Sequence, residues 1–272
     1  MLSDVFADVR LYLHLLGMQV RSQLQYKVNL AVDVTTYFLV TALEYTVVFL
    51  FFSTFPTLLG WHVGEVALLG AIVSFTFGLA ELFGGGIENF SETIRRGEFD
   101  RALLRPISAL VQVASSEFRI RRLGRLTQGV LMFALALHLL PGLGWTLPSI
   151  SVLCFGIVSG AVAFISVMLL GATLCFWTVE TTELTNILTY GGREIMSWPL
   201  VVYNQTLQRF FLFVVPLASS LYLPTCYILG RPLPFGLPAV TVFASPLVAV
   251  LFAGSSYLVW QVGIRHYQSA GG

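Results

Sequence analysis

The chain has 272 residues, of which 56% are hydrophobic and only 11% are charged, and its mean hydropathy is +0.82. Soluble domains contain roughly 25% charged residues, so this composition excludes a soluble domain of useful size and indicates an integral membrane protein. Since most of the length is needed to cross the bilayer, residues 1–272 are expected to form one membrane domain.

Residues 1–28 are predicted to form an amphipathic helix that lies along the cytoplasmic membrane surface. Apolar side chains recur at spacings of three and four residues, which places them on one helical face. These residues are Leu2, Val5, Phe6, Val9, Tyr12, Leu13, Leu16 and Val20. Asp4 and Asp8 argue against a cleavable signal peptide, which begins with basic residues and continues with an unbroken apolar core. An interfacial helix is therefore the favoured interpretation.

Six apolar segments follow and are predicted to span the membrane, since about 20 mostly apolar residues cross ~30 Å of hydrocarbon. The predicted spans are Leu30–Phe52, Val66–Gly86, Gly124–Leu140, Ile150–Val179, Phe210–Leu229 and Leu237–Val262. The fold is therefore expected to be an all-α polytopic membrane domain. The outer connection at residues 222–238 is rich in proline and glycine, which predicts short broken turns or a shallow re-entrant element.

The basic residues are distributed unevenly over the predicted loops. If the N-terminus is cytoplasmic, Arg231 is the only one of the fifteen basic residues that falls outside. The remaining basic residues, Arg193 and Arg209 among them, fall in predicted cytoplasmic segments. The positive-inside rule therefore places both termini in the cytoplasm.

The segment Glu88–Ser108 is a polar island between the second and third predicted spans. Its charges are balanced, four acidic and four basic: Glu88, Glu92, Arg95, Arg96, Glu98, Asp100, Arg101 and Arg105. Such balance favours a docking surface for another protein over a nucleic-acid surface, which would be one-sided. Phe99, Leu103 and Leu104 supply apolar anchors, and Gly97 allows a turn between two short helices. The alternative is an ordinary solvated loop.

The chain shows no recognisable catalytic motif. A nucleotide-binding P-loop needs a Gly-Lys-Ser/Thr sequence, but the only lysine, Lys27, follows Tyr26. There is no H-E-x-x-H, G-x-S-x-G or C-x-x-C sequence, and the four histidines are scattered over different segments. We therefore expect no catalytic residue, cofactor or metal site in this chain.

Asp33 and Glu44 are acidic residues within the first predicted span. They lie eleven residues apart, which at 100° per residue places them within about 20° of one face, and Tyr37 falls near the same stripe. An acid at the bilayer centre costs ~2.5–3.5 kcal/mol, so Glu44 should face protein or water. These residues either line a substrate path or form a hydrogen-bonded tie to another helix or a second subunit.

Four arginines crowd the cytoplasmic start of the third predicted span: Arg119, Arg121, Arg122 and Arg125. Such clusters commonly bind anionic lipid headgroups, at ~1 kcal/mol for each residue, although guidance of an anionic substrate is an alternative. Glu81 lies near the cytoplasmic end of the second predicted span, where solvation is expected.

The arrangement of an interfacial helix, six spans and a charged segment after the second span resembles the type-2 ABC exporter permeases. Ile94-Arg95-Arg96-Gly97-Glu98-Phe99-Asp100, followed by Leu103-Leu104-Arg105-Pro106, resembles the group whose permeases work with a separately encoded ATPase. Gly191-Gly192 and Trp198-Pro199 also resemble that group.

The resemblance implies a permease of the bacterial inner membrane that is not an enzyme by itself. Residues 87–123 would contain the coupling segment, with Ile94–Asp100, Leu103 and Leu104 docking on an ATPase subunit that binds ATP and Mg²⁺. The permease would work with a second subunit, as a homodimer or heterodimer, and Asp33, Tyr37 and Glu44 would lie at the pathway or the dimer seam. Family substrates include drugs, lipids and polysaccharides. The alternatives are a membrane scaffold or sensor that recruits a cytosolic partner, or a secondary carrier.

Overall fold

The computed structural model describes residues 27–267, except 106, 119 and 179–181, and a few separate positions between residues 12 and 25. Within these residues the regular structure is helical, with no strands, so the all-α prediction is confirmed there. Most of the predicted interfacial helix lies outside the described residues. In its described part, the Gln23 side chain accepts a hydrogen bond from the Ile120 backbone N–H at 2.9 Å, which connects this segment to the start of the third predicted span.

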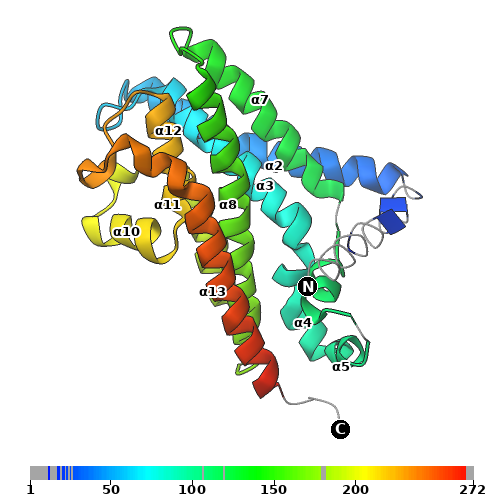
Figure 1. The fold of residues 1–272 in the computed structure, drawn as a ribbon. Coiled ribbons are helices and arrows are strands. Elements are labelled where there is room, and N and C mark those ends of the chain that lie inside the picture. The colour runs from blue at the N-terminus through cyan, green and yellow to red at the C-terminus, as the bar shows by residue number, and fades with distance from the viewer. Residues whose placement is uncertain are drawn as a thin grey trace.

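Five long helices form the body of the described structure. They are α2 (Lys27–Thr54), α3 (Val63–Glu88), α7 (Leu123–Leu139), α8 (Leu147–Leu174) and α13 (Ser245–His266). α3 lies centrally, between α7 and α8, and α13 packs along α8 (Figure 1). The rings of Phe77 in α3 and Phe164 in α8 meet edge to face at 4.9 Å, so large aromatic side chains fill the centre of the bundle.

Four stretches of the described chain are long and apolar enough to cross a membrane: Leu30–Thr54, Val63–Arg95, Leu147–Leu174 and Ala239–His266. A fifth candidate joins Gln205–Val214 to Leu217–Ile228, if this pair, bent by 74°, is counted as one span. The apolar helix α7 has 17 residues and is shorter than the other spans. The structure therefore confirms four or five membrane-spanning candidates, and the predicted count of six is not confirmed.

Short helices form the segment between α3 and α7. They are α4 (Phe90–Arg95), α5 (Glu98–Leu103), α6 (Ala109–Ala114) and η1 (Ile120–Arg122). α4 and α5 lie at the same end of the molecule as the C-terminal end of α13 (Figure 1). Gly97 joins them with a left-handed φ of 66°, so the predicted turn between two short helices is confirmed. A Cβ atom at Gly86 would lie 1.9 Å from the Val113 carbonyl oxygen, which requires glycine where α6 packs on α3.

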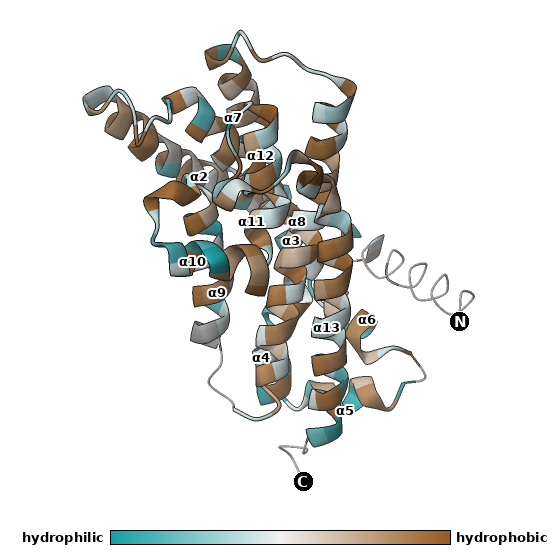
Figure 2. Ribbon diagram, turned by 60° about the vertical axis from the view of Figure 1, so that its left-hand side comes forward, coloured by the Kyte–Doolittle hydropathy of each residue, from teal (hydrophilic) through white to brown (hydrophobic). Residues whose placement is uncertain are grey.

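The chain between α8 and α13 is divided into short elements. They are α9 (Thr182–Met196), η2 (Leu200–Val202), α10 (Gln205–Arg209), η3 (Phe210–Val214), α11 (Leu217–Ser220), α12 (Tyr222–Ile228), η4 (Pro234–Gly236) and η5 (Ala239–Ala244). Figure 2 shows hydrophilic residues gathered at α10 and near α5, whereas α3 and α8 are largely hydrophobic.

The segment Gln205–Ile228 begins and ends at the same end of the bundle. Near its start, Gln208 lines a cavity together with Trp61, and near its end the Tyr222 ring lies 5.8 Å from the Trp61 ring. Between these points the chain enters the interior of the bundle, where Leu217 lies beside Gly192 in the second half of α9. The segment therefore enters and leaves the bundle at one end, as a re-entrant segment does, and the prediction of a span at Phe210–Leu229 is not confirmed.

α9 and the residues that follow it, up to Leu200, connect the two ends of the bundle. Thr185 contacts Gly171 near the last turn of α8, whereas Leu200, after α9, lines the cavity beside Trp61 at the opposite end. Arg193 and Arg209 were predicted to share one side of the membrane, opposite Arg231, and the structure does not place them together. Arg193 lies within the bundle, and the Arg209 guanidinium lies 5.5 Å from the Phe235 ring at the Trp61 end.

Candidate functional site

A buried ion cluster joins α3, α7 and α9. An Arg125 Nη1 donates to the Glu81 carboxylate at 2.7 Å, and an Arg122 Nη2 donates to the Glu88 carboxylate at 2.5 Å. The Tyr190 hydroxyl donates to Glu88 at 2.5 Å and lies 3.2 Å from Glu81. Two carboxylates and two guanidinium groups balance each other, so the cluster is neutral as a whole. We refer to Glu81, Glu88, Arg122, Arg125 and Tyr190 as the buried ion cluster.

The burial of this cluster corrects two predictions. Arg122 and Arg125 were expected to bind lipid headgroups, but their side chains are buried and paired with acids. Arg119 and the side chain of Arg121 lie outside the described residues. Glu81 was expected to be solvated near the membrane surface, yet it is fully buried. Burial alone would lower the pKa of Arg122, but the neighbouring Glu88 and Glu81 carboxylates outweigh this effect and raise it above the ordinary value.

The sequence contained a signal for this cluster. Glu81 and Glu88 are seven residues apart, which places both carboxylates on one face of α3. Arg122 and Arg125 are three residues apart and therefore share a face of the following helical segment. Two acids and two bases at matching helical spacings indicate an ion-paired interface between adjacent helices. The position of Tyr190, about a hundred residues further along, could not be inferred in this way.

A second group of charges surrounds Arg193 in α9. Its guanidinium pairs with the Glu44 carboxylate of α2 and lies 2.8 Å from the Glu194 carboxylate. The Arg193 side chain is 7% exposed, whereas Glu44 is 38% exposed and Glu194 is 58% exposed. A tie from Glu44 to another helix, one of its two predicted interpretations, is therefore present. We refer to Glu44, Arg193 and Glu194 as the charge triad.

The other residues predicted for the pathway or seam do not join this triad in the described structure. Asp33 lies eleven residues earlier in α2 and is exposed. The backbone of Tyr37 is helical, but its side chain lies outside the described residues. The roles of Asp33 and Tyr37 remain predictions.

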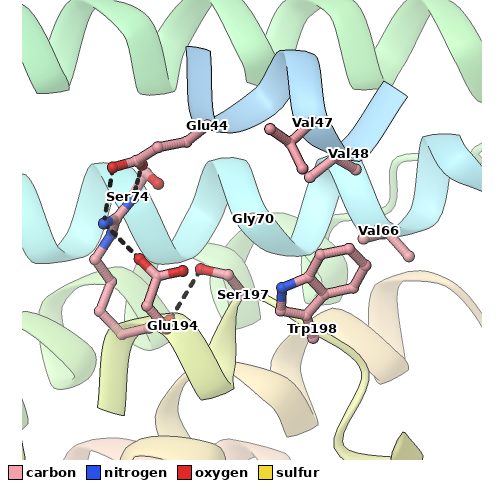
Figure 3. A pocket seen from close by; sticks show the side chains of 10 residues that line it. Glu44, Val47, Val48, Val66, Gly70, Ser74, Glu194, Ser197 and Trp198 are labelled. Atoms are coloured by element: carbon pink, nitrogen blue, oxygen red, sulfur yellow. Dashed lines mark hydrogen bonds and ion pairs between the residues drawn. The ribbon is translucent and has the colours of Figure 1, made fainter. Parts of the chain in front are cut away.

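The charge triad lines part of a cavity of about 280 Å³, which lies between α2, α3 and the end of α9. Figure 3 shows Glu44, Ser74 and Glu194 at one end and Trp198, Val66 and the valines of α2 at the other. The lining residues are Glu44, Val47, Val48, Val66, Gly70, Ser74, Arg193, Glu194, Ser197 and Trp198. One end of the cavity is therefore charged and the other is aromatic and apolar.

An aromatic cluster holds the predicted coupling segment against the bundle. The Phe99 ring lies 5.0 Å from Phe90, 5.6 Å from Phe176, 6.2 Å from Trp260 and 5.1 Å from Tyr267. Burial, with the Asp100 carboxylate nearby, raises the pKa of Tyr267 to about 12. Phe99 was expected to be an exposed anchor, but it is fully buried, so this expectation is wrong. Instead Phe99 fixes α5 to the ends of α8 and α13.

The same segment has an exposed face. Leu104 is 86% exposed and Leu103 is 41% exposed, so both remain available as apolar anchors. Ile94, another predicted coupling residue, is buried. The predicted coupling residues with exposed side chains are Arg95, Arg96, Glu98, Leu103 and Leu104. The assignment of this face to ATPase docking stays a prediction.

Arg231 forms a clamp at the opposite end of the molecule. It donates to the Glu65 carboxylate at 2.7 and 2.6 Å and to the Gly60 carbonyl oxygen at 2.6 Å. Its guanidinium also lies 4.4 Å from the centre of the Trp61 ring, within the range of a cation–π contact. The clamp joins the loop after the re-entrant segment to the start of α3. Sequence reasoning placed Arg231 at this end but did not identify its partners.

Nothing in the described residues resembles a metal centre, because no group of three His, Cys, Asp or Glu side chains there could hold an ion. Comparison with curated proteins and with solved structures finds no match. A sequence model of the ABC-2 family transporter proteins, in contrast, matches residues 38–271, which is most of the chain. With its membrane-spanning helices and this match, the chain belongs to the ABC-2 family of transporter proteins and is the membrane permease of an ABC-type transporter.

Proposed function

We propose that this chain is the membrane half of an ATP-driven exporter that crosses the bacterial inner membrane six times with both termini in the cytoplasm. A separate ATPase subunit binds ATP and Mg²⁺, and a second permease subunit completes the translocation path. The observation that carries this proposal is the polar helix α9, which connects the two ends of the bundle and holds a charged cavity against α2.

The six crossings are α2, α3, α7, α8, α9 and α13. α8 ends beside the aromatic cluster, where the Phe176 ring lies 5.4 Å from Phe90, and α13 ends there too, where Tyr267 meets Phe99. Because both helices end on this side, α13 must begin on the opposite side. The chain between the end of α8 and the start of α13 therefore crosses the membrane an odd number of times. The re-entrant segment supplies none, so α9 and the residues up to Leu200 supply one. With 15 residues α9 is about 22 Å long, so the following residues are needed to complete the crossing.

Coupling passes through two contacts on either side of Asn89. On one side, Glu88 belongs to the buried ion cluster and connects the end of α3 to α7 and α9. On the other side, Phe90 and Phe99 belong to the aromatic cluster and connect α4 and α5 to α8 and α13. A displacement of α4 and α5 by the ATPase would thus be transmitted to four helices, because well-packed and fully paired contacts do not deform easily.

The second subunit is proposed to cover α2. The membrane-spanning part of α2 is the least buried of the described spans, with 0% of its apolar window covered by the rest of the chain. Asp33 and half-exposed Glu44 lie on this helix, and an acidic side chain in a span requires a protein or water environment. A partner subunit at α2 would supply that environment and would make the cavity beside Glu44 part of a path between subunits.

The docking proposal is tested on the exposed anchor Leu104. We expect Leu104→Asp to leave the chain folded and inserted, but to lower the ATPase that co-purifies from native membranes at least about tenfold, as loss of an interface anchor does. ATP turnover of the purified complex should fall in parallel. Leu147→Asp is the matched control, because Leu147 is also an exposed leucine but lies at the opposite end, in the first turn of α8. Equal ATPase retention in wild type and Leu104→Asp would contradict docking at this face.

A further inference from the structure

The charge triad is not electrically balanced. Arg193 provides one positive charge for the two carboxylates of Glu44 and Glu194, and among the residues that the structure describes these are the only charged ones that line the cavity. Both carboxylates keep part of their surface exposed, while the guanidinium is almost fully buried. A net negative charge at membrane depth is unfavourable unless a cation approaches it. The cavity therefore favours a positively charged occupant and disfavours an anion.

The other end of the cavity specifies what kind of cation fits. The Trp198 indole forms one wall and is supported by the Phe51 ring, whose centre lies 6.0 Å away. Val47, Val48 and Val66 line the remainder of this end. Tryptophan is the aromatic side chain with the strongest cation–π attraction, and it prefers weakly hydrated organic cations. Indole and valine side chains would also bury an apolar body, which a hydrated inorganic ion lacks.

A metal ion does not fit this arrangement. The described lining of the cavity contains two carboxylates, both already in contact with Arg193, and no His or Cys residue. The hard cations Ca²⁺ and Mg²⁺ require about six oxygen ligands, which these groups do not supply.

We propose that this cavity binds a monovalent organic cation, a quaternary or protonated amine with an apolar body about the size of one aromatic ring. Its positive charge lies between the Glu194 and Glu44 carboxylates and the face of Trp198, and its apolar part lies against the valines. The volume of about 280 Å³ is near the lower limit of small-molecule sites, which sets the size of the apolar body. This inference rests on the proposed export function, because it assigns the substrate class to the cavity in that path.

The test compares two probes of the same shape. Phenyltrimethylammonium carries a permanent positive charge, and tert-butylbenzene is its neutral counterpart. Binding of each to the purified full-length chain is measured by equilibrium dialysis in nanodiscs of zwitterionic phosphatidylcholine. We expect saturable binding of the cation, and only non-saturable partitioning of the neutral probe. Glu194→Gln and Trp198→Leu should each weaken cation binding about tenfold, because each removes one of the attractive groups.

The control variant is Glu92→Gln, which removes an exposed carboxylate on α4, outside the cavity. It should bind the cation as wild type does. Glu194→Gln retains the Arg193–Glu44 pair, so its thermal midpoint should stay close to that of wild type and exclude misfolding as the cause. Equal cation affinity in wild type and Glu194→Gln, saturable binding of tert-butylbenzene as tight as that of the cation, or no saturable binding would each overturn the proposal.

The ATPase is absent from this experiment, which separates the two proposals. If the cation binds as expected but Leu104→Asp retains the ATPase, the cavity assignment stands and the docking proposal fails. If the ATPase docks as expected but the cation does not bind, only the substrate class is wrong.

Discussion

The buried ion cluster and the charge triad are built from the same kinds of side chain but differ in balance and exposure. In the buried ion cluster, Glu81 and Glu88 face two arginines, and their side chains are 0% and 11% exposed. In the charge triad, Glu44 and Glu194 share one arginine and are 38% and 58% exposed. A neutral cluster in which each carboxylate faces a guanidinium behaves as a rigid connection, whereas an unbalanced and half-exposed one can respond to an arriving charge.

The helix α9 carries members of both groups. Tyr190 bonds to the buried ion cluster, and Arg193, three residues later, is the centre of the charge triad. Residues three apart lie on the same helical face, so a displacement of α9 moves both together. The Phe77 ring of α3 contacts an arginine of each group. The Arg125 guanidinium lies 5.1 Å from the ring centre, and the Arg193 guanidinium lies 6.0 Å from it. The buried ion cluster is thus a rigid connection beside the predicted coupling segment, whereas the charge triad, deeper in the bundle, is exposed enough to respond to a bound charge.

The largest expected effect follows from breaking the rigid connection. Glu81→Leu leaves Arg125 buried without its carboxylate partner, and removal of one member of a buried pair costs about 3–5 kcal/mol of stability. We therefore expect a strong loss of monodisperse protein and a lower thermal midpoint in detergent. The double variant Glu81→Leu/Arg125→Leu should recover most of this loss, since neither charge then remains. A single variant as stable as wild type would show that this pair does not hold the bundle together.

A somewhat smaller effect is expected at the aromatic cluster, which holds α4 and α5, the predicted coupling helices, against the bundle. Phe99→Ala removes a fully buried ring from contact with four others, and such truncations cost about 3 kcal/mol. Leu104→Ala, at an 86% exposed position in the same segment, should change stability by less than about 0.5 kcal/mol. Thermal unfolding and limited proteolysis between α4 and α6 distinguish the two. If Phe99→Ala unfolds as wild type does, α5 is not anchored through this ring.

Hydropathy predicted the class of the protein and four of its spans, because a lipid-facing helix must be apolar over its whole length. It could not distinguish a span from a re-entrant segment at Phe210–Leu229, because an apolar sequence indicates an apolar environment but not whether lipid or protein provides it. Nearly all residues from Val215 to Ile228 are buried within the protein itself. The proposed crossing, α9, was missed for the opposite reason: it carries polar residues such as Thr185 and Arg193, which are compatible with membrane depth because the rest of the chain buries them.

The candidate site was predictable only in part, for a related reason. The sequence indicated that Glu44 needs a partner within the bundle, but Arg193 lies 149 residues away and was assigned to a loop. Phe99 was taken for an interface anchor because its neighbours are charged, yet the ring turns away from them into the aromatic cluster. Local sequence predicts that such side chains must be covered, but the fold decides whether the chain itself or a partner covers them.

The smallest expected effect on stability lies in the charge triad, at Glu44. Glu44→Gln removes the negative charge but keeps an oxygen that accepts from Arg193, and Arg193 still pairs with Glu194. Since glutamine keeps a hydrogen bond to Arg193 and Glu194 keeps its ion pair, we expect stability to change by less than about 1 kcal/mol. Transport should nevertheless change, because the cavity becomes neutral. Glu44→Leu, which also removes the acceptor, should in addition lower the yield of assembled complex. Thermal midpoints, oligomer content and transport in reconstituted vesicles are compared for both variants. If Glu44→Gln destabilises the chain as strongly as Glu81→Leu, the charge triad is a second rigid connection and the contrast between the two groups is wrong.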